Sequence, residues 1–526
     1  MVKTFNKTYE DFMRKFNPEH QVIHCDGIDL DKQHFQIRVD QLTAHLINLG
    51  VEKGMGVGYS IINCGDNLPL FIAIARIGAY AVPQFQGIPH VAKSAMFKNA
   101  GIVLAVVDGS QADGLKKEAD KAGAEFKIAV IDNYSDYYSL KGECKSNINI
   151  NDYVIDDPDK DLSLLIASSS GTTGIPKMVK MTQKTIGSEV TVVIEMVTKG
   201  RIDINKNSVV NVAFPLSTSV ISIIIGTAFS GDTVIYSNDN TPLKFISNIE
   251  KWQCNYMCSP PAFYESMLLL KDKQNFDLSS LQVVGAGMDF CSPALLSRLK
   301  TMFPNLTKYV NGYGLVETCN VFMHTNVDIS GDEITGVSTL TLAESVDNII
   351  EVRDQDGNIV DNGQTGELYI KGSNVVKGYV TQRDDLSGIF VDGWFCTGDI
   401  VRKESDKTVT LMGRMKYFIK RGGKSVSPIV VQNAINETEG IQDSGVVGVP
   451  HPLFGEMIWA FVVRSLGSEA SLKDIKMCCR QILPYYMMPD QVTFIDAIPK
   501  KSGVGKVDFE KLKEMAESEL KKINFK

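Results

Sequence analysis

One segment restricts this chain more than any other: a loop of small hydroxyl residues and glycines that directly follows an apolar, β-rich run. The run covers residues 162–167, and residues 168–177 read Ser-Ser-Ser-Gly-Thr-Thr-Gly-Ile-Pro-Lys. Glycine lets backbone N–H groups approach an anion closely, while hydroxyls add donors and the lysine adds a cation. The loop therefore suits phosphate oxygens, although its composition alone also fits a flexible surface loop. The spacing of a Walker loop is absent.

Composition narrows the class of protein. The chain has 526 residues, which is several times the length of a typical domain. Hydrophobic residues make up 44% and charged residues 22% of it, which is typical of a globular protein rather than a disordered or fibrous one. The formal net charge of −8 argues against a broad surface for nucleic acid or anionic membranes. We therefore expect no nucleic-acid partner.

The sequence gives no indication of a membrane span or a signal peptide. Residues 1–7 lack an apolar core, and the longest apolar run, residues 220–229, is much shorter than the roughly 20 residues that a spanning helix needs. The 10 cysteines are scattered and suit reduced thiols, so we expect a cytoplasmic protein. Cys254 and Cys258 have the spacing of two metal ligands, but no second pair completes a structural zinc site.

Short β-rich runs alternate with helix-period segments through most of the chain, which predicts an α/β architecture. The predicted strands include residues 58–62, 102–107 and 126–131, and the predicted helices include residues 68–80 and 112–122. Beyond Gly336, closely spaced strands at 349–353 and 366–370 alternate with turn signals and predict a β-rich module. After Gly413 a further set of patterns, at 444–449, 457–463 and 472–482, predicts a compact C-terminal domain.

The Ser/Gly/Thr loop resembles the signature loop of the adenylate-forming superfamily. This superfamily includes acyl-CoA synthetases, the adenylation domains of peptide synthetases and beetle luciferases. Further segments resemble family motifs in the expected order, so the resemblance covers nearly the whole chain. They are residues 77–83 (K-A-G-x-x-x-x-P), 285–287 (the glycine turn of the adenine pocket), 311–317 (Y-G-x-T-E), 394–399 (T-G-D), 413–420 (the hinge motif) and 499–508 (P-x-x-x-x-G-K). The chain is most similar to a stand-alone acyl-CoA synthetase.

The resemblance implies a division of the chain. Residues 1–413 would form a large N-terminal AMP-binding domain with two doubly wound α/β subdomains and a β-rich subdomain. Residues 414–415 would form the hinge, and residues 416–526 a small, mobile α+β lid. The active site would lie between the two domains.

The resemblance also implies an activity. The family joins a carboxylate to the α-phosphate of ATP, expels pyrophosphate and transfers the acyl group to a thiol. We therefore expect a carboxylic acid substrate, ATP with Mg²⁺, and coenzyme A as the acceptor. An acyl-AMP ligase that loads the phosphopantetheine arm of a separate carrier protein is the alternative. A luciferase-like oxidase and a nucleotide-binding pseudoenzyme are more remote readings.

A nucleotide-binding set follows from the matched motifs. Tyr313 would lie against adenine, Asp399 would accept hydrogen bonds from the ribose hydroxyls, and Arg414 would reach the ribose or a phosphate. The whole set is Ser169, Ser170, Gly171, Thr173, Gly174, Lys177, Gly285, Ala286, Gly287, Tyr313, Gly314, Asp399 and Arg414.

Four residues carry the implied catalytic roles. Lys506 would place its ammonium between the carboxylate and the α-phosphate while charge develops there. Glu317 would bind Mg²⁺, which prefers oxygen ligands, and Thr172 would hold the β- and γ-phosphates. Lys420 would belong to the face that serves thiol transfer, with an exposed basic strand as the alternative for it and for Lys416. Lys416 stands at the hinge position.

The sequence departs from the family pattern at four positions. Val316 replaces a hydroxyl residue, and Met178 replaces the usual glycine after the loop lysine. Thr218 stands where many acyl-CoA synthetases have histidine, and Val430 where the family often has glutamate. These departures indicate a divergent member.

The residues near Phe214 bear on which acid the enzyme would accept. Amino-acid-activating domains carry an aspartate near Phe214, and residues 215–217, Pro-Leu-Ser, offer none. Residues 214–225 and 285–290 would line the acyl pocket. Their apolar and small character suits an aliphatic or aryl acid, although most of these side chains fit a core equally well.

Overall fold

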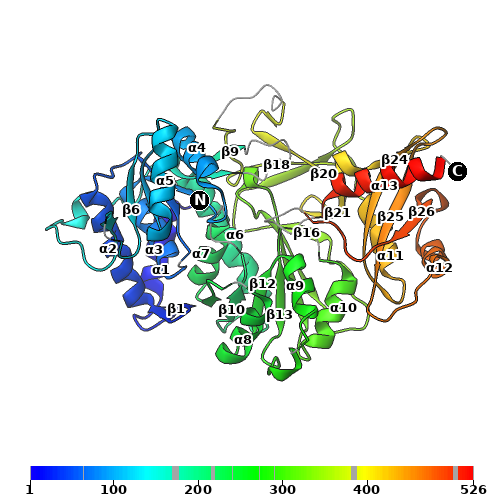
Figure 1. Ribbon diagram of the computed structural model, residues 1–526, viewed down its shortest axis with the longest axis horizontal. Helices are drawn as coiled ribbons and strands as arrows, with labels where there is room; N and C mark the ends of the chain where they lie inside the picture. The colour runs from blue at the N-terminus through cyan, green and yellow to red at the C-terminus, as the bar shows by residue number, and fades with distance from the viewer. Residues whose placement is uncertain are drawn as a thin grey trace.

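The computed structural model describes residues 2–62, 64–134, 136–168, 177–214, 220–239, 241–271, 273–288, 291–380, 388–500 and 507–524. The chain forms a large mixed α/β part followed by a small C-terminal part. Figure 1 shows the N-terminal elements at the left, the central elements in green and the C-terminal elements in orange and red at the right. This arrangement confirms the predicted α/β class with a small additional C-terminal domain.

The first sheet has seven strands in the order β7-β6-β5-β3-β4-β8-β9, and all neighbours are parallel except β8 and β9. Its strands are β3 (Gly56–Ser60), β4 (Tyr80–Pro83), β5 (Ile102–Val107), β6 (Lys127–Val130), β7 (Tyr138–Ser139), β8 (Ser163–Ser168) and β9 (Met178–Thr182). The associated helices are α1 (Phe5–Lys15), α2 (Lys32–Asn48), α3 (Cys64–Ile77), α4 (His90–Ala100) and α5 (Gly109–Lys121). The segment between β8 and β9 contains the predicted phosphate loop.

The second sheet has 14 strands and joins a parallel half to an antiparallel half. The parallel half comprises β1 (Gln21–Cys25), β10 (Val209–Val212), β11 (Thr233–Tyr236), β12 (Tyr256–Ser259), β13 (Val283–Ala286) and β14 (Lys308–Tyr313), with β2 (Ile28–Asp31) antiparallel at its edge. Five helices accompany it: α6 (Gln183–Gly200), α7 (Ile221–Phe229), α8 (Pro242–Trp252), α9 (Pro261–Leu268) and α10 (Pro293–Met302).

The antiparallel half corresponds to the predicted β-rich module. It comprises β15 (Met323–Asp328), β16 (Thr339–Leu342), β17 (Ile349–Arg353), β18 (Thr365–Lys371), β19 (Phe390–Val391), β20 (Trp394–Lys403) and β21 (Thr408–Arg414). These strands do not form a separate sheet, because β15 pairs with β14 and β16 pairs with both β15 and β21. One continuous sheet therefore runs from the parallel strands to Asp399 and Arg414.

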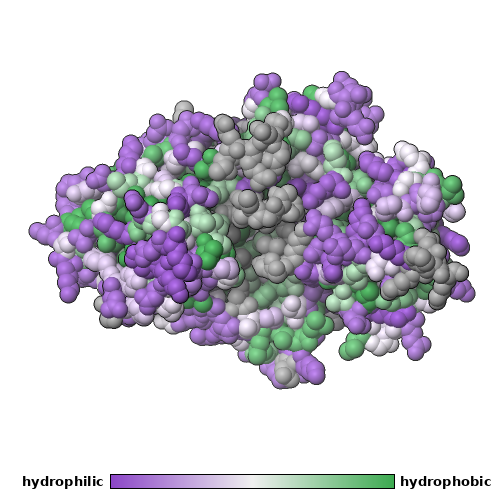
Figure 2. Space-filling model, turned by 45° about the horizontal axis from the view of Figure 1, so that its top comes forward, coloured by the Kyte–Doolittle hydropathy of each residue, from purple (hydrophilic) through white to green (hydrophobic). Residues whose placement is uncertain are grey.

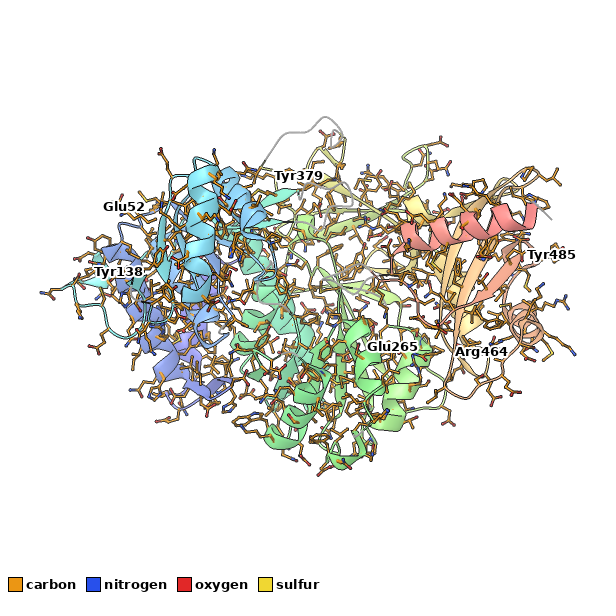
Figure 3. The ribbon with its side chains drawn as sticks, in the orientation of Figure 1. Glu52, Tyr138, Glu265, Tyr379, Arg464 and Tyr485 are labelled. Atoms are coloured by element: carbon orange, nitrogen blue, oxygen red, sulfur yellow. The ribbon has the colours of Figure 1, made fainter. Side chains whose placement is uncertain are left out.

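The C-terminal part packs helices against a five-stranded sheet. Its strands are β22 (Ile419–Arg421), β23 (Lys424–Val426), β24 (Ile441–His451), β25 (Gly455–Arg464) and β26 (Gln491–Phe494), and its helices are α11 (Pro428–Asn436), α12 (Leu472–Ile482) and α13 (Phe509–Asn524). It contacts the larger part at α9 and α10. There, Arg298 pairs with Glu265 and donates to the backbone carbonyl of Gln442 at 3.4 Å. Figure 3 shows Glu265 on the side of the green helices that faces the C-terminal strands.

The structure corrects one expectation about the cysteines. Eight of the described cysteines, including Cys254 and Cys258, are free, but Cys25 is disulfide-bonded. Cys254 is buried, and burial raises the pKa of Cys258 to about 12, so both thiols are protonated core groups.

Within the described residues, every helix is too short or too polar to cross a bilayer. On the face shown in Figure 2, hydrophobic residues are scattered among hydrophilic ones. Exposed hydrophobic side chains scattered in this way are ordinary for a globular protein.

Candidate active site

The carboxyl ends of two adjacent parallel strands carry the first predicted site residues. β13 ends at Ala286 and β14 at Tyr313, and the two strands pair in register from Val283 to Ala286. Gly287 follows β13 directly. In open parallel sheets this edge is where ligands bind, because loops diverge there and leave backbone groups available.

Gly285 is required for packing. A Cβ atom at this position would lie 2.9 Å from the side chains of both Cys258 and Tyr256. The glycine therefore lets β12 and β13 approach each other, and the phenol of Tyr264 donates to its carbonyl. Ala286 is also buried, so this segment contributes backbone more than side chains to the strand end.

Asp399 joins three of the predicted residues. It lies on β20 directly opposite Arg414 on β21, and only 5% of it is exposed. The Tyr313 phenol donates to one carboxylate oxygen at 2.5 Å, and Arg414 Nε lies 3.0 Å from the other. Burial, together with the Asp399 charge, raises the pKa of Tyr313 well above its ordinary value, so the phenol remains a neutral donor. The structure thus brings Tyr313, Asp399 and Arg414 together.

A tight turn follows Tyr313 and carries Glu317. Gly314 is at its first position because a Cβ there would lie 1.9 Å from the Asn320 carbonyl oxygen. Thr318 Oγ1 accepts the N–H of Leu315 at 2.9 Å, and the N–H of Asn320 donates to the Leu315 carbonyl at 2.8 Å. Cys319 and Asn320 adopt positive φ values of 51° and 63°. The turn therefore fixes where Glu317 stands relative to Tyr313.

Glu317 is linked to Lys177 by Tyr379. The Tyr379 phenol donates to Glu317 Oε1 at 2.7 Å, and the Lys177 ammonium lies 5.5 Å from the centre of the Tyr379 ring. The N–H of Val376 also donates to the Glu317 carbonyl at 3.0 Å. Two predicted residues, Glu317 and Lys177, therefore meet through a tyrosine that the sequence motifs do not identify.

Behind this turn lies a second group that sequence reasoning missed. Glu189 on α6 is fully buried and accepts hydrogen bonds from Ser222 on α7 at 2.6 Å and from the Asn320 amide at 2.8 Å. Burial raises the pKa of Glu189 to about 8, so the side chain is mostly a neutral acid at pH 7. Nothing in the helical pattern of residues 183–200 distinguishes this glutamate from a surface residue.

The raised pKa of Glu189 predicts that the stability of the fold depends on pH. Its pKa is about 8 when folded and near its ordinary value of 4.5 when unfolded, so the stability it contributes is complete below pH 4.5 and is lost as pH rises to about 8. The loss amounts to at most about 1.4 kcal/mol per pH unit. We expect Glu189→Gln to remove this part of the slope. Urea unfolding of both proteins between pH 5 and 8 measures the difference, and parallel profiles would contradict the assignment.

Three of the four departures from the family pattern have local explanations, and the fourth, Thr218, lies outside the described residues. Val316 packs against the large hydrophobic core of the N-terminal part, and Met178 is buried on β9. Val430 lies in the first turn of α11 and packs against the C-terminal core. At these positions an apolar side chain contributes to packing.

Lys420 lies apart from the residues above. It is exposed on β22, where its ammonium donates to Ser425 at 2.7 Å and its backbone N–H to Glu456 at 2.6 Å. Its recorded contacts thus lie within the C-terminal part, and the structure does not bring it together with Tyr313, Glu317 or Asp399.

Several predicted residues lie outside the described part of the chain. They are Ser169, Ser170, Gly171, Thr172, Thr173, Gly174, Thr218 and Lys506.

Comparison with known proteins identifies the family. Residues 11–380 match the AMP-binding enzyme family, and residues 430–506 match the AMP-binding enzyme C-terminal domain. A putative acyl-CoA ligase of Bacillus subtilis, YdaB, is 26% identical over 508 residues, which cover 95% of this chain and 96% of YdaB. A feruloyl-CoA synthase of Amycolatopsis is 25% identical over 504 residues, which cover 94% of this chain and 95% of the synthase.

Solved structures agree in fold. ATP-bound MatB of Rhodopseudomonas palustris superposes with a TM-score of 0.78 at 22% identity, covering 97% of this chain and 98% of MatB. The amide bond synthetase McbA of Marinactinospora thermotolerans gives a TM-score of 0.80 at 20% identity, covering 97% and 99%. The family matches over residues 11–380 and 430–506, together with the acyl-CoA ligase relatives, show that the chain belongs to the AMP-binding enzyme family, the adenylate-forming superfamily of acyl-CoA synthetase type, and is an AMP-forming acid–thiol ligase.

Proposed function

We propose that this enzyme converts an aliphatic or aryl carboxylic acid into its acyl-adenylate, releases pyrophosphate and transfers the acyl group to coenzyme A. The observation that carries the proposal is the Asp399 carboxylate, which Tyr313 and Arg414 hold at the carboxyl edge of the sheet beside the turn that bears Glu317. A buried, oriented carboxylate is suited to accept hydrogen bonds from two adjacent hydroxyls of a ribose.

In this proposal different residues of the chain bind the ribose, the adenine and the phosphates of ATP. Asp399 would hold the ribose, and the ring of Tyr313, which packs edge-on against Phe322 at 5.5 Å, would present a face to adenine. Gly285, Ala286, Gly287 and Gly314 would let the backbone approach the nucleotide. Lys177 and the loop before it would hold the β- and γ-phosphates.

The donor set is compatible with Mg²⁺ bound together with ATP. Within the described residues no three acidic, histidine or cysteine side chains form a protein-only metal site. Mg²⁺ in nucleotide enzymes is usually held by one or two carboxylates and the substrate phosphates, and Glu317 offers one such carboxylate. When bound, the ion would neutralise charge on the phosphate oxygens.

Lys506 would supply the ammonium that compensates the charge developing between the carboxylate and the α-phosphate. For the second step, we propose that residues 414–415 act as the hinge between a domain of residues 1–413 and a lid of residues 416–526, with Lys416 and Lys420 on the lid. Rotation about such a hinge would exchange the lysine of the first step for the surface that admits the thiol.

The acid is proposed from the residues around Phe214. Phe214 and the start of α7 at Ile221 are buried and apolar, and residues 215–217, Pro-Leu-Ser, offer no aspartate to pair with an ammonium group. Relatives named feruloyl-CoA synthase and trans-cinnamate:CoA ligase support an aryl acid, and YdaB supports coenzyme A as the acceptor.

A panel of carboxylic acids tests the proposal. Pyrophosphate release is measured for cinnamate, ferulate, medium-chain fatty acids, oxalate and amino acids, with and without coenzyme A. We expect release with an aryl or aliphatic acid and formation of its CoA thioester. Acylation of a carrier protein but not of coenzyme A would favour the carrier-loading alternative. ATP binding without any acid-dependent release would indicate a pseudoenzyme.

A further inference from the structure

Tyr379 occupies a position between two groups that the proposed function uses. It follows Gly378 and comes after β18, outside the motif matches. Its backbone forms an antiparallel bridge with Val179 on β9, and the N–H of Val380 donates to the Met178 carbonyl at 2.8 Å. Figure 3 shows Tyr379 near the top of the central region, close to the strands that Figure 1 labels β9 and β18. The tyrosine is thus fixed beside the strand that follows the phosphate loop.

The phenol of Tyr379 reaches the Glu317 carboxylate. The donated hydrogen bond of 2.7 Å falls on Oε1. A hydrogen bond to an ionised acceptor is short and directional, so it restricts rotation of the carboxylate about its last side-chain bond. The orientation of Oε2 is then set by the position of Tyr379.

The ring of Tyr379 acts on a second group. The Lys177 ammonium lies 5.5 Å from the ring centre, within the range of a cation–π interaction. The ring itself packs edge-on against Phe390, with the ring centres 5.8 Å apart. One side chain therefore holds the predicted metal-binding carboxylate and the lysine at the end of the phosphate loop.

This arrangement bears on the departure at Val316. The related motif usually has a hydroxyl residue at this position, and here the valine packs against the core instead. The phenol of Tyr379, from a different part of the sequence, supplies a hydroxyl beside Glu317. Glu317 therefore has a hydroxyl contact that comes from outside its own motif.

We propose that Tyr379 is a positioning residue for nucleotide binding: its phenol orients Glu317 and its ring places Lys177, so that the carboxylate and the ammonium meet the same triphosphate. This inference rests on the proposed function, because it concerns the same site. Tyr379 acts through Glu317 and Lys177.

The test separates orientation from packing. Tyr379→Phe keeps the ring, the contact with Phe390 and the cation–π geometry, and removes the hydrogen bond donated to Glu317. ATP binding is measured by titration calorimetry at a series of Mg²⁺ concentrations, without an acid substrate. We expect the Mg²⁺ concentration for half-maximal ATP binding to rise about 10-fold, as loss of one hydrogen bond to a charged group implies, while ATP affinity without Mg²⁺ stays within about 2-fold. Tyr379→Ala, which also removes the ring, should weaken ATP binding with and without Mg²⁺.

Tyr369 provides a matched control. Its phenol donates to Glu367 at 3.3 Å, and the Arg353 guanidinium lies 4.5 Å from its ring centre, so it repeats the same chemistry on β18. Tyr369→Phe should leave the Mg²⁺ dependence unchanged. An unchanged Mg²⁺ dependence in Tyr379→Phe would overturn the inference alone, provided that the wild type binds ATP. A wild type that does not bind ATP with Mg²⁺ would overturn the proposed function as well.

Discussion

Lys506→Ala is expected to lower the rate of adenylation about 10²-fold or more, because one preorganised charge at a developing anion contributes that much in comparable sites. The described residues on each side of Lys506 lie next to each other. Lys500 and Val507 form an antiparallel bridge, and the N–H of Asp508 donates to the Pro499 carbonyl at 2.8 Å. Acid-dependent exchange of pyrophosphate into ATP measures the rate.

The properties that Lys506→Ala impairs show whether the lysine acts in catalysis or in folding. ATP affinity and thermal stability of Lys506→Ala should stay close to those of the wild type, and transfer to coenzyme A from a supplied acyl-adenylate should persist. Lys511→Ala is the control, since Lys511 is an exposed lysine of α13 that pairs with Glu514 at 3.2 Å. Unchanged exchange in Lys506→Ala would remove this residue from the proposed mechanism.

Asp399→Ala is expected to weaken ATP binding about 10²-fold. The change removes two proposed hydrogen bonds to the ribose, each worth about 1.5–3 kcal/mol when the acceptor is charged. Even the lower value, taken twice, corresponds to about 10²-fold in affinity. The variant also leaves Tyr313 and Arg414 without their carboxylate partner. Calorimetric titration with ATP measures the loss.

A thermodynamic cycle that combines Asp399→Ala with a nucleotide lacking the 2′-hydroxyl separates the ribose contact from this local disturbance. The wild type should bind 2′-deoxy-ATP more weakly than ATP, and Asp399→Ala should bind the two nucleotides equally. Tyr313→Phe keeps the ring and the carboxylate, so it should still discriminate between them. If Asp399→Ala discriminates as strongly as the wild type, Asp399 does not contact the 2′-hydroxyl.

Local sequence patterns predict a helix or strand when its whole hydrophobic pattern lies within that one segment of the chain. The strand at 102–107 and the helix at 472–482 agree with β5 and α12 residue for residue. The pairings that join distant segments are not encoded in this way. Ile23 on β1 lies beside Val234 on β11, and the β-rich strands continue the second sheet through β15 and β16. Such contacts depend on how the whole chain packs, and a strand's own residues do not specify its neighbour.

The site residues also fall into two groups: those that sequence motifs predict and those that only the three-dimensional contacts reveal. The motifs predict Tyr313, Asp399 and Arg414, and the structure brings these three together. Tyr379 and Glu189 lie outside the motifs quoted above, and they make contacts with Glu317 and Asn320, which are far away in sequence. Lys420 carries a motif match, but the structure places it on the C-terminal sheet among contacts of that sheet.

The proposed reaction depends on a mixed anhydride between the acid and the α-phosphate of ATP. It is tested most directly by supplying the acid with ¹⁸O in its carboxylate and analysing the nucleotide product by mass spectrometry after CoA thioester formation. We expect AMP that carries one ¹⁸O atom, because the bridging oxygen stays on phosphorus when the thiol attacks the carbonyl carbon. Appearance of ¹⁸O in orthophosphate with ADP as the product, or unlabelled AMP, would contradict it.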